Sequence, residues 1–370
     1  MTRLKLGMLG GGQGAFIGAV HRIASRIDGR FDLVAGALSS DPARAVKSAA
    51  ELEIERSYDN FEAMAVAEST RLDGIDAVAI VTPNHMHAGP AIAFLNAGIH
   101  VICDKPLAAT IEDAKAIESA VSKSKARFFL THNYTGYPLI RQAREMVANG
   151  DLGDLRIIQA EYAQDWLTDA VDSSNKQADW RTDPARAGAG CIGDIGTHAF
   201  NIATFVTGMV PNELSAELSS FVSGRQVDDN AFIRMRYQNG ARGTIWSSQV
   251  AVGCENGLKL RVYGDKGGLE WNQENPNQMT FARFSEPKQI ITRGGAGLGS
   301  GAGRWTRIPP GHPEGYLEGF ANLYNDIADI ISGTNDNGLV PDLSAGLDGM
   351  WFITSCIDSS NANGSWIKRY

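Results

Sequence analysis

The chain has 370 residues, of which 43% are hydrophobic and 21% charged, as in packed globular proteins rather than disordered, collagen-like or coiled-coil chains. Its length fits two or three domains. The net charge of −8 has the wrong sign for a general nucleic-acid binder, so we expect no such partner. The 41 glycines are the one compositional excess, and the turns described below account for many of them.

The N-terminus and the cysteines indicate a cytoplasmic protein without a membrane partner. A glycine run interrupts the first apolar residues, so the start of the chain does not resemble a signal peptide. No apolar run approaches the roughly 20 residues that a membrane-spanning helix needs. The cysteines are far apart and form no disulfide or zinc pattern, and we expect reduced thiols; they are Cys103, Cys191, Cys254 and Cys356.

The first part of the chain alternates apolar strands with helices. Strands are expected at 4–9, 31–38, 76–81, 100–103 and 128–131. Helices are expected at 16–27, at 88–97 before Gly98, and after Thr110, which forms a capping box with Asp113. Continuous apolar strands alternating with helices are typical of a doubly wound parallel sheet buried on both faces. We therefore predict an α/β domain over residues 1–131.

The pattern changes after residue 131, where the strands follow one another closely. They are expected at 155–163, 213–222, 230–238, 241–251, 257–263 and 268–272, with turns at 239–240, 264–267 and 275–277. Residues 294–303 are expected to form a mobile loop, and 316–332 and 343–360 helices. We predict an α+β domain over 132–370 with a largely antiparallel sheet. One open face of this sheet would suit subunit packing in a homo-oligomer, either a dimer or a homotetramer.

A glycine-rich turn follows the first strand and precedes the first helix. Its residues fit the pattern G-x-G-x-x-A; they are Gly10, Gly11, Gly12, Gln13, Gly14 and Ala15. Glycine lets the backbone approach a pyrophosphate, whose charge the helix N-terminus then stabilises. The context favours a dinucleotide-binding Rossmann domain over an ordinary tight turn. Ser39 stands where an NAD site places a carboxylate and Asp41 two residues later, which favours NAD, with NADP left open through Arg44.

Three later strings resemble signature positions of the Gfo/Idh/MocA oxidoreductases, the family of glucose–fructose oxidoreductase and inositol dehydrogenase. Asp-Lys-Pro at 104–106 is similar to the family's Glu-Lys-Pro, with a shorter carboxylate. Asp-Ile-Gly-Thr-His at 194–198, preceded by Gly-Ala-Gly at 188–190, is similar to its Asp-x-Gly-x-His segment. Thr-Pro-Asn at 82–84 resembles a loop near the cofactor. The resemblance spans nearly the whole chain and implies an NAD(P)-dependent dehydrogenase of CH–OH groups.

The chemistry of alcohol oxidation explains these residue types. The reaction removes a hydroxyl proton, which suits the near-neutral imidazole of His198 as general base. Asp194 is one helical turn away and is expected on the same face. Lys105 is predicted to hold the hydroxyl, stabilise the alkoxide and lower the pKa of His198. The resemblance implies the same roles. Each residue also has a structural alternative. His198 could be a packed helix histidine, Asp194 could only pair with it along the helix, and Lys105 could be a solvated surface lysine.

Further residues are expected around the cofactor and the substrate. The expected cofactor contacts are Gly10, Gly12, Gln13, Gly14, Ala15, Ser39, Asp41, Thr82, Pro83, Asn84, His87, Asp104, Lys105 and Asn133. The expected substrate contacts are Lys105, Tyr134, Tyr162, Gln164, Trp166, Arg181, Asp194, His198 and His312. Their aromatic faces and hydrogen-bonding groups suit a polyol ring, with packing as the alternative. The segment 312–316 resembles one in relatives that act on sugars and inositols. His85 and His87 have no nearby Cys or carboxylate partner, so we expect no metal.

The predicted function is the oxidation of a cyclic polyol or sugar, such as scyllo- or myo-inositol or a pyranose like glucose, by a nicotinamide cofactor. A redox-neutral, NAD-dependent glycoside hydrolase of the same family is an alternative. A non-catalytic dinucleotide sensor is another, and the presence of Lys105 and His198 counts against it.

Overall fold

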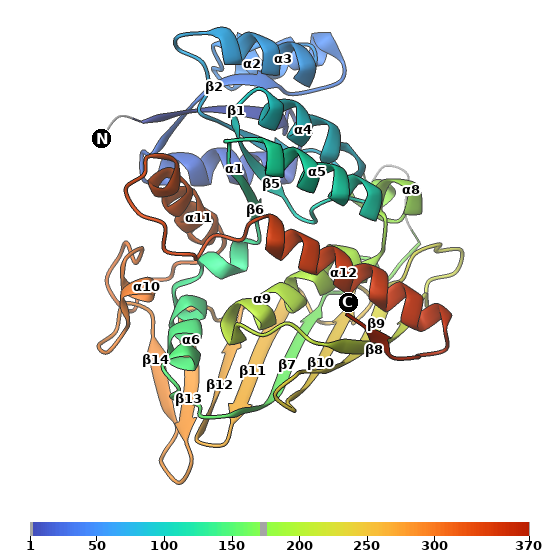
Figure 1. Cartoon of the computed structure of the whole chain (residues 1–370), viewed down its shortest axis with the longest axis vertical. Coiled ribbons are helices and arrows are strands. Elements are labelled where there is room, and N and C mark those ends of the chain that lie inside the picture. Colours follow the sequence, from blue (N-terminus) through green and yellow to red (C-terminus); the bar gives the residue numbers. More distant parts are fainter. Residues whose placement is uncertain (1–2, 171–175, 370) are drawn as a thin grey trace. The chain divides into compact units, whose positions relative to one another are not determined.

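The computed structural model describes residues 3–170 and 176–369, which form two compact units (Figure 1). The first unit contains the residues up to Gly136 and returns to include Tyr316–Leu347. The second contains Tyr137–Gly315 and the residues from Asp348 onward. The expected division at residue 131 differs from this grouping, because the chain leaves the first unit and comes back to it.

The first unit is built on a parallel sheet. In the described residues its six strands run in the order β3-β2-β1-β4-β5-β6. The strands are β1 (Leu4–Gly10), β2 (Phe31–Ala37), β3 (Arg56–Ser57), β4 (Ala77–Val81), β5 (His100–Asp104) and β6 (Phe128–Thr131). The predicted α/β sheet is therefore confirmed. Its one unpredicted member, β3, is two residues long and carries no periodicity to detect.

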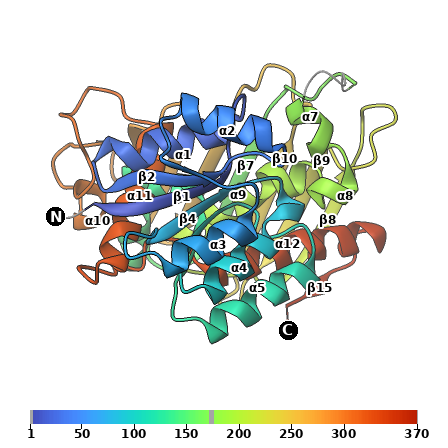
Figure 2. The same cartoon turned by 90° about the horizontal axis from the view of Figure 1, so that it is seen from above.

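Helices cover both faces of this sheet. They are α1 (Phe16–Ile27), α2 (Pro42–Glu51), α3 (Phe61–Thr70), α4 (Ala88–Asn96), α5 (Ile111–Lys123) and α11 (Tyr316–Ile331), with 3₁₀ turns η1 (Asn84–Met86) and η2 (Asn133–Gly136). Helices α1 and α11 pack together, and α4 and α5 lie side by side across the sheet from them (Figures 1 and 2). Thr110 caps α5, with its Oγ1 accepting a hydrogen bond of 3.1 Å from the Asp113 N–H. Helices α2 and α3 were not predicted.

Helix α11 belongs to this core although it lies far along the chain. Tyr324 packs edge-on against Phe31 of β2, with ring centroids 5.4 Å apart, and its hydroxyl lies 2.8 Å from Nδ1 of His21. Phe320, Ala321 and Ile327 join the same apolar cluster. Burying this face of α11 explains why the chain returns to the first unit.

The second unit is built on a mixed, mostly antiparallel sheet. Its nine strands, among the described residues, run in the order β14-β13-β12-β11-β7-β10-β9-β8-β15. They are β7 (Leu155–Ala163), β8 (Glu213–Ser219), β9 (Asn230–Arg236), β10 (Arg242–Ser248), β11 (Gly257–Gly264), β12 (Gly267–Asn272), β13 (Gln278–Arg283), β14 (Gln289–Thr292) and β15 (Ile367–Lys368). The largely antiparallel sheet is confirmed, with β7 and β10 paired in parallel. Strands β13 to β15 were not predicted.

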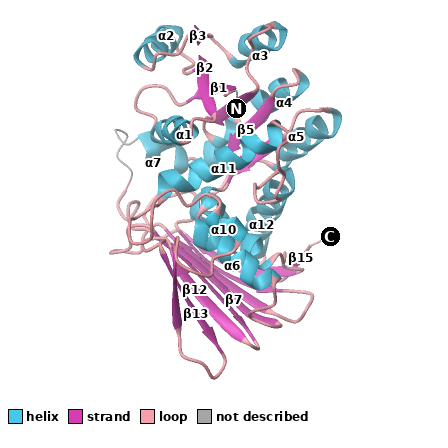
Figure 3. Ribbon diagram, turned by 90° about the vertical axis from the view of Figure 1, so that its left-hand side faces the viewer, coloured by secondary structure: helices cyan, strands magenta, loops and turns pink. Residues whose placement is uncertain are grey.

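Helices cover one face of this sheet and leave the other open (Figure 3). The helical segments are α6 (Pro138–Ala148), α7 (Lys176–Arg181), α8 (Pro184–Ala187), the π-helical turn η3 (Ile192–Gly196), α9 (Thr197–Thr207), α10 (Ser300–Gly303) and the larger part of α12 (Leu343–Asn361). In β9, Ala231, Ile233 and Met235 are buried while Phe232 and Arg234 are exposed, which is the alternation of a one-sided sheet. The expected loop at 294–303 contains the short helix α10.

Two further properties concern the whole described chain. No helix in residues 3–170 or 176–369 is long and apolar enough to span a bilayer. All four cysteines carry free thiols, and Cys103, Cys191 and Cys356 are buried.

Candidate active site

The carboxyl ends of the parallel strands gather most of the expected cofactor residues. Gly10 ends β1, Thr82 follows β4, Asp104 ends β5, and Asn133 comes soon after β6. The strand order reverses between β1 and β4, and ligands of doubly wound sheets bind outside the carboxyl ends at such a switch point. The first unit therefore offers one edge for a dinucleotide.

The glycine-rich turn has the backbone that a pyrophosphate requires. Gly10 and Gly14 have φ values of 74° and 76°, in the left-handed region that favours glycine. A Cβ on Gly12 would lie 2.8 Å from the Leu38 carbonyl oxygen. Ala15, the residue before α1, provides no side-chain cap. The first N–H groups of α1 thus remain open to an anion, and the turn fits a dinucleotide phosphate.

A further glycine, outside the predicted pattern, packs against this turn. A Cβ on Gly18, in the first turn of α1, would lie 2.4 Å from the Gly11 Cα. Helix α1 packs against the turn at this point. Gly18 stands three residues beyond Ala15 and therefore lies outside the pattern G-x-G-x-x-A, so the pattern did not mark this close contact.

The expected ribose partners lie at the end of β2. The Asp41 carboxylate caps α2 by accepting a 3.1 Å hydrogen bond from the Arg44 N–H, and Ser39 Oγ accepts one from the Asp41 N–H. Gln13 donates its backbone N–H to Ser48 Oγ and its side-chain amide to Glu51. Gln13 thus joins the glycine turn to α2, the helix that Asp41 caps, and the parts of Gln13, Ser39 and Asp41 in cofactor binding stay predictions.

Asp104 and Lys105 close strand β5. Thr131 Oγ1 donates a 2.9 Å hydrogen bond to Asp104 Oδ1, and Nε2 of the buried His21 lies 3.9 Å from the same oxygen. Burial acts to raise the pKa of Asp104, but its interactions with the neighbouring His21 ring and then with the charge of Lys105 lower it below its usual range. The carboxylate is therefore ionised beside Lys105, which precedes a cis proline, Pro106.

His87 bridges two loops from within the protein. Its Nδ1 lies 2.9 Å from the Pro106 carbonyl oxygen and its Nε2 3.0 Å from that of Thr82. The ring is fully buried, and this burial lowers its pKa. His87 thus connects the loop that carries Thr82, Pro83 and Asn84 to the loop that carries Lys105, a role that the sequence did not indicate.

The residues after β6 are buried. Asn133 and Tyr134 begin η2, and the Tyr134 ring packs edge-on against Tyr316 at 6.4 Å. Burial and then the charge of Lys105 lower the pKa of the neighbouring His132 to about 3, with Asp104 acting in the opposite direction. His132 is therefore a neutral imidazole in the folded protein.

In the second unit, Asp194 and His198 lie on consecutive helical segments. Asp194 is in the π-helical turn η3, whereas the sequence predicted an ordinary helix for both residues. Asp194 Oδ2 accepts hydrogen bonds from Arg181 Nε at 3.2 Å and from Gln249 Nε2 at 2.9 Å. His198 lies in the first turn of α9, with its ring centroid 6.1 Å from that of Tyr162. These four residues and Tyr162 form one cluster.

A chain of hydrogen bonds extends this cluster. The Tyr162 hydroxyl and Gln164 Nε2 both donate to Asn256 Oδ1, at 2.7 and 2.9 Å, and Trp166 Nε1 donates to Gln164 Oε1 at 3.0 Å. The Arg181 guanidinium lies 6.0 Å from the Trp166 ring centroid. The expected substrate residues of this unit are thus brought together, with the exception of His312.

Two members of the cluster, Gln249 and Asn256, were missed. Gln249 directly follows β10 and Asn256 directly precedes β11, and neither belongs to a motif. No contact joins His312 to this cluster in the described residues. His312 is exposed, and its backbone carbonyl oxygen accepts a 2.5 Å hydrogen bond from Arg293 Nη2. Within residues 3–170 and 176–369, no group of His, Cys, Asp or Glu is arranged to hold a metal ion.

Comparison with known proteins decides the family. Residues 4–132 match the model of an oxidoreductase family with an NAD-binding Rossmann fold, and residues 140–270 match the GFO/IDH/MocA C-terminal domain. A crystal structure of an oxidoreductase from Sinorhizobium meliloti is 52% identical, with a TM-score of 0.91 over 100% of both chains. The chain belongs to the GFO/IDH/MocA oxidoreductase family.

Other GFO/IDH/MocA proteins show which ligands their own sites take. An inositol dehydrogenase homologue from Azotobacter vinelandii, solved with NADH and myo-inositol, is 34% identical with a TM-score of 0.92, over 100% of this chain and 98% of that one. Levoglucosan dehydrogenase from Pseudarthrobacter phenanthrenivorans is 29% identical over 77% of this chain and 78% of its own. The family resemblance and the NAD-binding Rossmann domain inferred from sequence are confirmed.

Proposed function

We propose that this GFO/IDH/MocA oxidoreductase oxidises a secondary alcohol of a cyclic polyol or pyranose. The observation that carries the proposal is the cluster around His198, in which an imidazole, a carboxylate and an amide lie beside aromatic rings. Such a mixture recognises a ring with several hydroxyl groups. Inositols and sugars are the substrate class that matches it.

The proposed roles follow from the chemistry of each side chain. NAD, when bound, supplies the hydride acceptor. His198 takes the hydroxyl proton as general base, since an imidazole titrates near neutral pH. Lys105 donates a charged hydrogen bond to the reacting oxygen and stabilises the alkoxide. Asp194, held by Arg181 and Gln249, accepts hydrogen bonds from ring hydroxyls.

A substrate screen tests this function. The purified protein is incubated with NAD or NADP and with scyllo-inositol, myo-inositol, glucose and levoglucosan, and absorbance is followed at 340 nm. We expect NADH formation with at least one ring polyol, and faster turnover with NAD than with NADP. Absence of any rise across the panel contradicts the dehydrogenase; release of sugar from a glycoside without net NADH would indicate the redox-neutral hydrolase instead.

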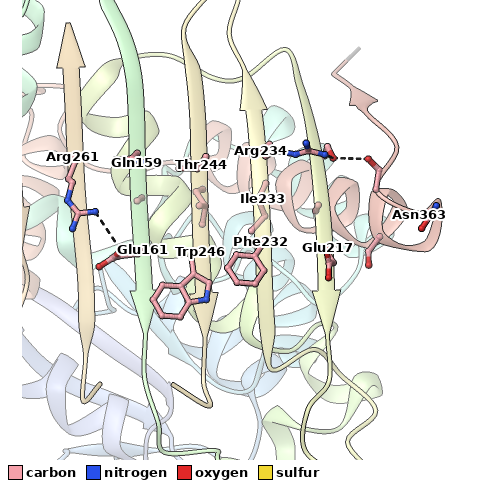
Figure 4. A pocket seen from close by; sticks show the side chains of 16 residues that line it. Gln159, Glu161, Glu217, Phe232, Ile233, Arg234, Thr244, Trp246, Arg261 and Asn363 are labelled. Atoms are coloured by element: carbon pink, nitrogen blue, oxygen red, sulfur yellow. Dashed lines mark hydrogen bonds and ion pairs between the residues drawn. The ribbon is translucent and has the colours of Figure 1, made fainter. Parts of the chain in front are cut away.

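The open face of the nine-stranded sheet supports a second part of the proposal, the assembly into a homo-oligomer. Phe232 and Trp246 stack on this face at 6.4 Å, beside charged groups such as Glu161, which pairs with Arg261 at 3.7 Å (Figure 4). Glu161 also pairs with Lys259 at 2.8 Å. An apolar stack beside charges of both signs suits a self-complementary contact with a second copy. Light scattering should give the mass of a dimer or tetramer, and Phe232→Glu should lower it. A wild-type monomer contradicts this assembly.

A further inference from the structure

The π-helical turn that carries Asp194 is held by a carboxylate from a distant part of the chain. Asp228, just before β9, accepts hydrogen bonds from the Gly190 N–H at 2.9 Å and from the Ile192 N–H at 2.7 Å. The Cys191 thiol donates to the same carboxylate at 3.1 Å. The Asp228 backbone oxygen accepts a 2.8 Å bond from the Cys191 N–H. One residue therefore satisfies three consecutive backbone N–H groups.

These N–H groups need an acceptor from outside the helix. The first N–H groups of any helical segment have no partner within it, and leaving them buried and unbonded is costly. Cys191, which precedes η3, offers no side-chain cap of its own. Asp228 supplies the missing acceptors, and it approaches so closely that a Cβ on Gly190 would lie 1.9 Å from its backbone oxygen. Gly190 is thus required by this contact.

The bonds favour the charged form of the carboxylate. Burial raises the pKa of Asp228 above its usual value, although the hydrogen bonds from Ile192, Cys191 and Gly190 act in the opposite direction. An asparagine in this place would have one oxygen and one NH₂ group. Its NH₂ group would have to face the N–H of either Gly190 or Ile192, and two donors cannot bond each other. Both hydrogen bonds can therefore form only with a carboxylate.

We infer that Asp228 is a positioning residue that fixes the backbone of 190–192 and thereby the place of the Asp194 carboxylate. Two sets of hydrogen bonds then hold this segment. The backbone at its start is bonded to Asp228, and the Asp194 carboxylate is bonded to Arg181 and Gln249. The catalytic consequence rests on the proposed function, because it assumes that Asp194 contacts the substrate. Misplacing such a group by about 1 Å can cost on the order of 10²-fold in rate.

The neighbouring Asp229 provides a matched control. Its carboxylate is buried and, like that of Asp228, accepts bonds from backbone N–H groups, those of Phe221 at 2.9 Å and Val222 at 3.0 Å, with Arg225 as an ionic partner. Asp229→Asn therefore damages a comparable buried carboxylate without touching the bonds of the Asp228 side chain to η3. A loss of stability alone would affect both variants alike.

The experiment compares Asp228→Asn, Asp228→Glu and Asp229→Asn with the wild-type enzyme. Polyol kinetics are expressed per NADH-binding site, NADH binding is followed by fluorescence, and amide hydrogen exchange is measured over 186–198 and 219–224. For Asp228→Asn we expect kcat/KM for the polyol to fall by about 30- to 100-fold, with the NADH Kd within about twofold of wild type. Exchange should accelerate at 190–194, and Asp229→Asn should keep kcat/KM within about threefold while exchange accelerates at 219–224.

The outcomes separate this inference from the proposed function. Equal kcat/KM losses in Asp228→Asn and Asp229→Asn, or unchanged exchange at 190–194, overturn the positioning role. If Asp228→Asn does not fold, Asp228→Glu decides by the same readouts, because it keeps the charge and only displaces the carboxylate. If the wild-type protein oxidises no polyol, the proposed function fails, and exchange at 190–194 still tests the hold of Asp228 on the turn.

Discussion

The edge of the first sheet and the cluster of the second unit are built in different ways. The glycine turn offers backbone: left-handed glycines, an uncapped helix start and open space around Gly14. The cluster around His198 consists of side chains, each oriented by another, as Gln249 orients Asp194 and Asn256 orients Tyr162. Backbone geometry is encoded locally, whereas a side-chain network depends on residues far apart in the chain. Substitutions should therefore affect cofactor and substrate separately.

The largest expected effect is that of a substitution in the His198 cluster, which should impair polyol oxidation and leave the cofactor edge of the first sheet intact. His198→Ala should reduce kcat by about 10³-fold, in the range that a general acid–base group contributes, and leave NADH binding within about twofold. Stopped-flow fluorescence of NADH binding and steady-state polyol oxidation measure the two effects. A His198→Ala enzyme that retains wild-type kcat contradicts the general-base role.

A smaller effect concerns the edge and its pH dependence. The folded pKa of His132, about 3, lies below the usual value of 6.5. The unfolded chain then takes up the proton first as the pH falls, so stability is lost as the pH drops from 6.5 toward 3. Between pH 6.5 and pH 5 the loss from His132 is about 2 kcal/mol, and His87 adds to it in the same direction.

Urea unfolding at both pH values measures this loss. His132→Gln, which has no titrating ring, should show a smaller decrease than wild type over the same interval, whatever its stability at neutral pH. An equal decrease in both proteins would contradict a neutral, buried His132.

The smallest expected effect compares two glycines of the first unit. Gly14 and Gly98 have φ values of 76° and 77°, and a Cβ on either would meet nothing within 4 Å. Alanine at each should therefore destabilise the protein by a similar amount, about 1 kcal/mol. Gly14→Ala should also weaken NADH binding several-fold, because it adds a methyl group to the phosphate turn, whereas Gly98→Ala should not. Equal NADH affinity in the two variants would remove Gly14 from the cofactor site.

The same contrast explains how far the sequence allowed prediction. The parallel strands, the cap Thr110 and the glycine turn were predicted because apolar runs and glycines act over a few neighbouring residues. Lys105, Asp194 and His198 were predicted as site residues because they stand in short strings, and their catalytic roles stay predictions. Gln249, Asn256 and Asp228 were not, because each acts through a partner that lies dozens of residues away and no local pattern marks it.

The π-helical turn and the return of α11 were missed for related reasons. A single π turn differs from an α turn only in which carbonyl group each backbone N–H bonds, and no local sequence pattern around Asp194 marks that difference. Helix α11 was predicted as a helix, but its apolar face fits either unit, and only the packing of Tyr324 on Phe31 assigns it to the first.

The return of α11 also bears on how the protein is made. On the ribosome the residues up to Gly136 emerge first, yet Phe31 and the face of α1 that meets α11 stay uncovered until Tyr316–Leu347 has been synthesised. The first unit therefore completes its core only after the strands of the second sheet from β7 to β14, and then Tyr316–Leu347, have emerged. A fragment ending at Gly136 should expose this apolar surface and aggregate, while adding α11 as a separate peptide should restore a soluble complex.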